Sequence, residues 1–362
     1  MNSNAFQIQP TIRRILILAE ERFSPLRSKT ANGAIAYLSK EVVAVIDSTR
    51  AGSTAQQVLG YGGAIPVVRD LAEGLRFAPT HLLIGIAPPG GRLPDSWRTM
   101  LTEAIENRLH LLNGLHTILS DDPYFAELAG QYNITITDWR KIPPEYEVVS
   151  KGHWATRKAK TILTVGSDCN IGKMTTMLEM YKDFQSRGLR SDFIGTGQTG
   201  IMISGRGISV DAIAGDYIAG SIEREIDRSD VEGFDYVFVE GQGALTHQGY
   251  SSVTLGLMHG TMPDAMILCH QPTRLKDDYG IPLRDLNSLI RFHEEAIRLF
   301  KPTKVVGIGI NSIGLTDEQS MEASKKIEAE TGLPAIDTFR FGGKVIADAL
   351  LRFFSSEEII TS

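Results

Sequence analysis

One stretch of the sequence, Thr161 to Thr176, constrains the fold more than any other. A short run of aliphatic and β-branched residues ends at Gly166, and the loop that follows closes with Gly172 and Lys173 at the start of a helix-compatible segment. This order of strand, loop and helix is the context of a phosphate-binding loop. Glycines let backbone amides point inward, the helix N-terminus adds partial positive charge, and the lysine adds a full charge. The stretch therefore predicts a site for a phosphate ester.

The spacing within this loop differs from the common pattern G-x-x-x-x-G-K-[ST]. Gly166 lies one residue further from Gly172 than that pattern requires, and Met174 stands where a hydroxyl would bind Mg²⁺. We therefore expect the loop to bind phosphate without a metal ion. The residues expected to bind the phosphate-bearing cofactor are Gly166, Ser167, Asp168, Cys169, Asn170, Ile171, Gly172, Lys173, Met174 and Thr175, with Gln198 and Asn311 from other loops.

The composition favours a globular protein of two domains. A chain of 362 residues is too long for one small domain, and 42% hydrophobic with 22% charged residues is ordinary for globular proteins. The net charge of −6 leaves no basic surplus, so we expect no nucleic-acid partner. No stretch reaches the ~20 apolar residues of a membrane span. The two cysteines, Cys169 and Cys269, suit a reducing compartment, and we expect a cytoplasmic protein with no membrane association.

In the first half of the chain, short apolar runs alternate with helix-compatible segments. This alternation predicts a parallel sheet of the Rossmann type. Asp47 closes the second run and could hold a ribose hydroxyl, but the first turn lacks G-x-G-x-x-G, so dinucleotide binding is not favoured. Pro143 and Pro144 indicate a linker, and we expect domains at 1–150 and 151–362. Strands are expected at 15–19, 42–46, 64–68, 81–86, 110–112 and 134–137.

The second half repeats the alternation around the phosphate-binding loop, which predicts a doubly wound sheet like that of P-loop NTPases. Asp211 could cap a helix that runs to Ile226, and Asp216 would then lie inside that helix among small apolar neighbours. Two exposed sheet edges favour a homo-oligomer. Strands are expected at 161–165, 236–239, 263–269 and 305–310, and helices at 175–188, 282–300, 316–331 and 343–354.

Polar residues follow several of these strands, at the edge where open α/β sheets bind ligands. Glu240 comes directly after 236–239 and could accept a proton or ligate metal-bound water, and glycines on both sides of Gln242 leave room for a ligand. At least one of His247, His259 and His270 is expected to act in catalysis or substrate binding. The candidate substrate-binding residues are Arg206, Asp216, Gln242, His270 and Arg274.

Two resemblances to known families follow from these motifs. The second domain resembles the dethiobiotin synthetase and septum-site ATPase branch of P-loop proteins in 166–168, 172–173, 239–243 and Asn311. The whole chain is identified as a member of a two-domain family in which a Rossmann-like domain precedes a P-loop domain. That likeness is carried by 29–31, 45–47, 85–87, 114–116, 138–140, 166–176, 197–200, 240–243, 255–260 and 263–270. Members of this family include D-glutamate N-acetyltransferases, which use acetyl-CoA in D-amino-acid catabolism.

The family resemblance implies an acetyl-CoA-dependent N-acetyltransferase that acts on a D-amino acid, most simply D-glutamate. The loop would hold the phosphates of coenzyme A, which need no metal ion at Met174. Glu240 is the expected base, with His247 or His259 as the alternative. Loop amides or Gln198 would contact the thioester oxyanion, and Arg206 or Arg274 would bind the substrate carboxylate.

Two alternative functions stay open at this point. The first is an ATP-dependent enzyme like dethiobiotin synthetase, with Mg²⁺ bound by Asp168, Thr175 and Glu240. The second is a nucleotide-binding regulator without chemistry. Binding of coenzyme A, or of ATP with Mg²⁺, separates the first alternative from the acetyltransferase.

Overall fold

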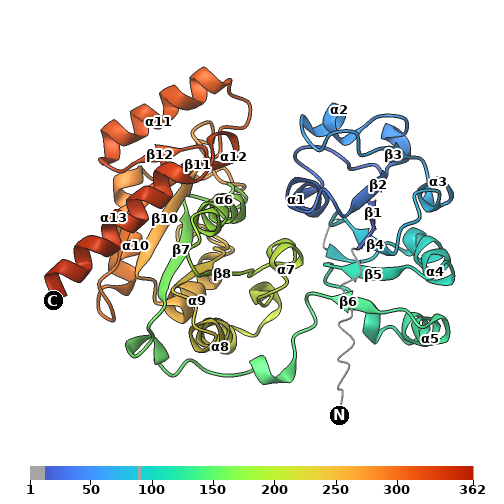
Figure 1. The fold of residues 1–362 in the computed structure, drawn as a ribbon, viewed down its shortest axis with the longest axis horizontal. Coiled ribbons are helices and arrows are strands. Elements are labelled where there is room, and N and C mark those ends of the chain that lie inside the picture. Colours follow the sequence, from blue (N-terminus) through green and yellow to red (C-terminus); the bar gives the residue numbers. More distant parts are fainter. Residues whose placement is uncertain (1–12, 89–90, 362) are drawn as a thin grey trace, which may run out of the picture. The chain divides into compact units, whose positions relative to one another are not determined.

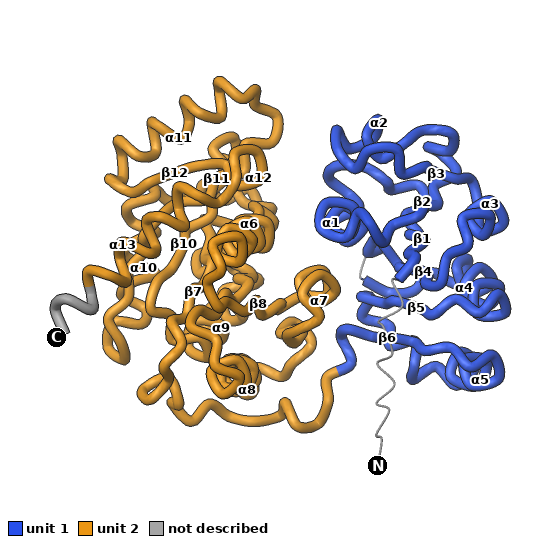
Figure 2. Tube along the Cα trace, viewed as in Figure 1, with its two compact units in different colours: residues 1–141 blue, residues 142–362 orange. Residues whose placement is uncertain are grey.

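The computed structural model describes residues 13–88 and 91–361, with side chains described as far as residue 356. The chain divides into two compact units, Met1–Lys141 and Ile142–Ser362 (Figure 2). In the described residues, each unit is built on a six-stranded parallel sheet with helices on its faces (Figure 1). The predicted fold class, two α/β domains with parallel sheets, is therefore confirmed.

The sheet of the first unit has the strand order β3-β2-β1-β4-β5-β6, which is the order of a Rossmann-like sheet. Strand β1 is fully buried, as expected for a parallel strand covered on both faces. The strands are β1 (Ile15–Leu18), β2 (Val42–Ile46), β3 (Val67–Val68), β4 (His81–Ile84), β5 (His110–Asn113) and β6 (Ile136–Asp138). The helices are α1 (Lys29–Tyr37), α2 (Ala55–Leu59), α3 (Leu71–Leu75), α4 (Arg98–Glu106) and α5 (Pro123–Tyr132).

Asp47, the carboxylate that closes β2, is buried and stabilises the turn that follows its own strand. Its oxygens accept the N–H groups of Phe23 and Thr49, both at 2.9 Å, and the hydroxyl of Thr49 at 2.6 Å. A buried carboxylate that accepts three internal hydrogen bonds stabilises the loops at this edge of the sheet. The structure gives Asp47 this structural role rather than the ribose contact that a dinucleotide-binding unit would need.

The sheet of the second unit has the order β12-β11-β10-β7-β9-β8, so the strand that leads into the phosphate-binding loop lies between β10 and β9. The strands are β7 (Lys160–Gly166), β8 (Ser191–Ile194), β9 (Tyr236–Val239), β10 (Ala265–His270), β11 (Lys304–Ile310) and β12 (Ala335–Ile336). The helices are α6 (Lys173–Ser186), α7 (Gln198–Ser204), α8 (Ile218–Val231), α9 (Ser251–Thr261), α10 (Leu286–Ile297), α11 (Asp317–Thr331), α12 (Thr338–Phe341) and α13 (Lys344–Thr361).

Helix α9 was not predicted from the sequence, and its packing explains why. An added Cβ at Gly260 would lie 2.4 Å from the carbonyl oxygen of Ala219, and one at Gly256 would lie 2.8 Å from the Ile218 side chain. Helices α8 and α9 therefore approach closely along a face of small residues. Because glycines replace large apolar side chains on that face, the helical period of hydrophobicity is weak.

The prediction that Asp211 caps helix α8 is wrong. The helix begins at Ile218, after two short 3-10 turns, and its N-cap residue is Tyr217, which makes no side-chain capping hydrogen bond. Asp216 lies in the second of these turns and is exposed, not inside an apolar helix. The turn at Gly215 interrupts the helix that the sequence pattern suggested.

The segment after the paired prolines packs against α8 and belongs to the second unit. The Tyr146 hydroxyl donates to Glu225, and the Ser221 hydroxyl donates to the carbonyl oxygen of Tyr146 at 2.7 Å. The buried carboxylate of Glu223 accepts the N–H groups of Lys151 at 2.6 Å and His153 at 2.8 Å. The segment that follows the predicted linker is therefore held in place by carboxylates of α8. None of the helices in the described part of the chain has the length and apolarity to cross a bilayer.

Candidate functional site

The candidate site is formed by the loops that follow β7, β8, β9, β10 and β11 at one edge of the second sheet. Because the strands are parallel, their carboxyl ends meet at this edge, where open α/β sheets bind ligands. The parallel topology alone therefore brings together, at one edge of the sheet, the predicted site residues that directly follow these strands.

The phosphate-binding loop has the backbone geometry of an anion cradle. Asn170 has φ +53° and Gly172 has φ +100°, and α6 begins at the next residue, Lys173. Left-handed residues next to a helix N-terminus turn successive amides toward one point. Lys173 is only 6% exposed, and its Nζ donates to the carbonyl oxygen of Asp168 at 2.8 Å. The amides, helix terminus and ammonium group together suit a phosphate.

The hydroxyls that could complete a magnesium site do not all face this cradle. Met174, at the position of the usual Ser or Thr, is 7% exposed and packs in the core. Thr176 is buried against β11, where an added Cβ at Gly309 would lie 2.4 Å from the Thr176 methyl group. Thr175 is half-buried. Only Thr175 is left to supply a side-chain hydroxyl from this turn of the helix.

Arg274, from the loop after β10, pairs with the phosphate-binding loop. Its Nε lies 2.7 Å from Oδ2 of Asp168, and another guanidinium nitrogen donates to the carbonyl oxygen of Cys169 at 3.3 Å. The other oxygen of Asp168 accepts the N–H of Cys169 at 2.7 Å. Asp168 is 1% exposed, so its charge is balanced inside the protein. Asp168 thus holds the loop in shape.

Glu240, directly after β9, is 4% exposed and is enclosed by the glycine-rich loop that follows β8. Its Oε2 accepts the N–H groups of Thr196 at 2.9 Å and Gly197 at 3.3 Å, and the Thr196 hydroxyl donates to its carbonyl oxygen at 2.8 Å. An added Cβ at Gly200 would lie 2.1 Å from Oε2. The glycines of this loop are therefore needed for its close approach to the carboxylate.

Two threonines that the sequence analysis did not name as site residues hold this region in place. The Thr164 hydroxyl, on buried strand β7, accepts the N–H of Gly241 at 2.9 Å, and Thr196 contacts Glu240 as described. The Gln242 amide donates to the carbonyl oxygen of Thr196 at 2.5 Å. A threonine in the middle of an apolar buried strand was the sequence signal for Thr164.

His270, at the end of β10, faces the phosphate-binding loop as a neutral group. Its Nδ1 lies 2.9 Å from the Ser167 hydroxyl. Burial lowers the pKa of His270 to about 4. The ring is therefore uncharged at neutral pH and interacts with Ser167 through a hydrogen bond, not through charge.

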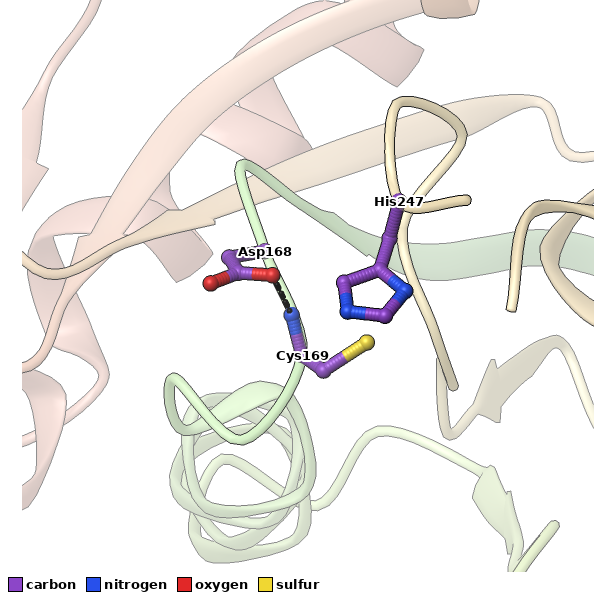
Figure 3. Close-up of side chains that lie close together, drawn as sticks. All are labelled: Asp168, Cys169 and His247. Carbon is purple, nitrogen blue, oxygen red and sulfur yellow. Dashed lines mark hydrogen bonds between the residues drawn. The ribbon is translucent and has the colours of Figure 1, made fainter. Parts of the chain in front are cut away.

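Asp168, Cys169 and His247 form a compact cluster beside the loop (Figure 3). All three side chains are buried, and one ligand atom from each lies within 4.8 Å of the others. Carboxylate, thiol and imidazole are donor types that bind zinc. The His247 ring stacks on Tyr250, with centroids 5.0 Å apart, and lies 5.2 Å from the ring of Tyr279.

The remaining predicted site residues divide between this edge and other places. Gln198 opens α7 beside Gly197, and Asn311 follows β11, with its Cβ 3.6 Å from where a Cβ on Gly172 would lie. Arg206 is instead paired with Asp192 and Glu232, away from the phosphate-binding loop.

His259 lies in the last turn of α9, where its ring is 5.3 Å from that of Phe300. Because α9 starts at the carboxyl edge of the sheet and leads back to the start of β10, its last turn is remote from the loop. The structure thus does not bring His259 or Arg206 to the predicted site. Asp216 stays on its exposed turn.

Comparison with known proteins places this geometry in a family. A relative from Tritonibacter scottomollicae named D-glutamate N-acetyltransferase is 40% identical over 284 residues, which cover 77% of this chain and 84% of the relative. A relative of the same name from a Pseudoalteromonas species is 33% identical over 276 residues, which cover 75% of this chain and 82% of the relative.

A solved structure also matches nearly the whole chain. The crystal structure of a DUF1611 family protein from Anabaena variabilis has a TM-score of 0.89 and 36% identity, and the match covers 94% of this chain and 99% of that one. Residues 148–347 match the P-loop domain of unknown function DUF1611_C, and residues 48–142 match the Rossmann-like domain DUF1611_N. The family predicted from the sequence is confirmed, and the chain belongs to the two-domain DUF1611 family.

Proposed function

We propose that this protein is an acetyl-CoA-dependent N-acetyltransferase that acts on D-glutamate. The names of the two relatives support the reaction class and the substrate. The observation that supports the proposal is a phosphate cradle whose lysine is buried and is followed by the buried Met174 instead of a hydroxyl residue. The buried carboxylate of Glu240 follows the neighbouring strand β9. Such a site can bind the phosphates of a cofactor, and its carboxylate can accept a proton nearby.

The residues of the loop fit coenzyme A. The loop amides, the N-terminus of α6 and Lys173 would hold its phosphates, and no metal ion is needed when no phosphoryl group is transferred. Asp168 is engaged by Arg274 and by the Cys169 amide, so it is poorly placed to serve as a magnesium ligand. Bound acetyl-CoA would supply the activated acyl group.

Glu240 is the proposed base. The ammonium group of D-glutamate must lose a proton before its nitrogen can attack a carbonyl carbon. The N–H groups of Thr196 and Gly197 hold the Glu240 carboxylate at the end of β9, next to the strand that carries the phosphate-binding loop. The carboxylate would take this proton and hold it within the protein until it is released.

The proposed function is tested by release of free thiol. Purified protein with acetyl-CoA should release coenzyme A when D-glutamate is added and not when L-glutamate is added, and N-acetyl-D-glutamate should accumulate in equal amount. Absence of thiol release across a panel of D- and L-amino acids would overturn the proposal. ATP consumption dependent on Mg²⁺ in the same panel would favour the ATP-dependent alternative.

The close contact between Gly200 and Glu240 gives a separate prediction. Gly200→Ala should lower kcat about 10- to 100-fold, because the new methyl group must displace the Glu240 carboxylate from its position 2.1 Å away. The melting temperature must be measured in parallel, because the methyl group would also lie 3.2 Å from the backbone Cα of Gly195. Gly130→Ala in α5 is the matched control, because an added Cβ there meets nothing within 4 Å. Unchanged kcat in Gly200→Ala would contradict the role of Glu240.

A further inference from the structure

His247 has a buried ring nitrogen that the proposed mechanism does not use. The residue is 2% exposed, and its Nε2 has no hydrogen-bond partner among the residues that the structure describes. Figure 3 shows the ring pointing toward the side chains of Asp168 and Cys169. A buried polar atom without a partner is costly unless a ligand supplies the missing contact. The position of this atom beside the phosphate-binding loop therefore indicates a ligand contact.

The other ring nitrogen decides the chemical character of Nε2. The N–H of Gly249 donates to Nδ1 of His247 at 3.2 Å, so Nδ1 is an acceptor and carries no proton. In a neutral imidazole the proton then belongs to Nε2. Nε2 is thus a hydrogen-bond donor, and the ring cannot act as a base through it.

The same hydrogen bond argues against a metal ion in this cluster. A metal ion on Nε2 needs the lone pair of that nitrogen, and metal-bound histidines donate from their second nitrogen to an oxygen atom. Here the second nitrogen instead faces an N–H donor. Arg274 and Lys173 also place two positive charges at Asp168 and its carbonyl oxygen, which oppose a divalent cation. The cluster therefore suits an oxygen acceptor better than a metal ion.

We propose that Nε2–H of His247 binds the carbonyl oxygen of the acyl group that is transferred, an inference that rests on the proposed acetyltransferase function. His247 lies on the same loop as Glu240, the proposed base, so one loop would supply both the proton acceptor and the carbonyl donor. The rings of Tyr250 and Tyr279 fix the plane of the imidazole. Both tyrosines are largely exposed, so aromatic side chains lie between His247 and solvent.

The role of this donor follows from the charge that develops in acyl transfer. The amine nitrogen of D-glutamate forms a bond to the carbonyl carbon, and negative charge builds on the carbonyl oxygen, where a donor lowers the barrier. The carbon–sulfur bond then breaks, the sulfur leaves with the bonding electrons, and it takes up the second proton that the nitrogen loses as it becomes an amide. The ammonium proton passes to Glu240. Asp168 does not oppose the developing charge, because Arg274 balances it.

Cys169 is not needed as a nucleophile in this scheme. Burial raises the pKa of its thiol, which disfavours the reactive thiolate. The thiol instead lies next to the imidazole of His247 (Figure 3).

The test uses a ketone analogue of acetyl-CoA in which a methylene group replaces the thioester sulfur, labelled with ¹³C at the carbonyl carbon. When it binds the wild-type protein, its carbonyl resonance should move downfield, as expected for a hydrogen-bonded carbonyl. In His247→Phe the resonance should return to its free position, while the affinity for coenzyme A itself changes less than threefold. His247→Gln, which keeps an N–H donor, should restore part of the shift. The kcat of His247→Phe should fall about 100- to 1,000-fold.

Several results would overturn the proposal. A downfield shift that persists in His247→Phe would place the donor elsewhere, and an equal loss of affinity for coenzyme A and for pyrophosphate would assign His247 to a phosphate. If the acidic limb of the pH profile of kcat/KM disappears in His247→Phe, His247 is the base. If the wild-type protein binds one zinc ion per chain and His247→Phe binds none, His247 is a metal ligand. Failure of the analogue to bind the wild-type protein would instead overturn the coenzyme A assignment, and this inference with it. Melting temperatures of both variants separate these outcomes from misfolding.

Discussion

Glu240→Gln should lower kcat by about 100- to 10,000-fold while the affinity for coenzyme A stays within a factor of three of wild type. The glutamine oxygen can still accept the N–H groups of Thr196 and Gly197, so the shape of the site should be preserved. The change removes the ability to take a proton from the substrate ammonium group. The substitution should therefore lower kcat without weakening the binding of coenzyme A.

The measurement is steady-state thiol release, combined with calorimetric binding of coenzyme A. Glu322→Gln on α11 is the matched control, because that carboxylate is exposed and lies outside the proposed site. A glutamine variant that keeps more than one third of the wild-type kcat would remove Glu240 from the mechanism. A large loss of coenzyme A affinity in the same variant would make it a binding residue.

The second large effect is expected at the lysine of the phosphate-binding loop. Lys173→Met should weaken coenzyme A binding about 10- to 100-fold, because a charge-assisted hydrogen bond to a phosphate contributes about 1.5–3 kcal/mol. Methionine keeps most of the apolar stem that is buried in the loop. The ammonium contact to the carbonyl oxygen of Asp168 is lost as well, so the melting temperature must be followed in parallel.

Lys182→Met tests whether loss of any lysine from the same helix has this effect. Lys182 is also on α6, but its side chain is 56% exposed, and its ammonium group lies 3.2 Å from the carboxylate of Glu179. The affinity of the Lys182→Met variant for coenzyme A should match that of the wild-type protein. Equal affinities of the Lys173 and Lys182 variants would show that the loop does not hold the phosphates.

The parallel sheets and the phosphate-binding loop could be anticipated from the sequence for a simple physical reason. Buried parallel strands are short runs of aliphatic residues, and polar residues directly after them must lie at one edge. This reasoning correctly placed Lys173, Glu240 and His270 at the carboxyl edge of the second sheet. It failed for His259, because a residue within a helix between strands can lie at either edge.

Other features depended on contacts that leave little trace in one sequence. Helix α9 was not predicted because glycines, not large apolar residues, face α8. The charge partners of Arg206 could not be foreseen, since Asp192 and Glu232 reach it only through the fold. The donor character of His247 depends on a backbone amide two residues away, which no residue pattern specifies.

The central claim is that the loop at Lys173 anchors coenzyme A rather than a triphosphate to be split. Calorimetric titration of the purified protein with coenzyme A and, separately, with ATP tests it most directly, each with and without Mg²⁺. The account predicts one coenzyme A per chain, bound equally well with and without Mg²⁺, and displaced only weakly by ATP. Tight binding of ATP that requires Mg²⁺, with no binding of coenzyme A, would contradict it.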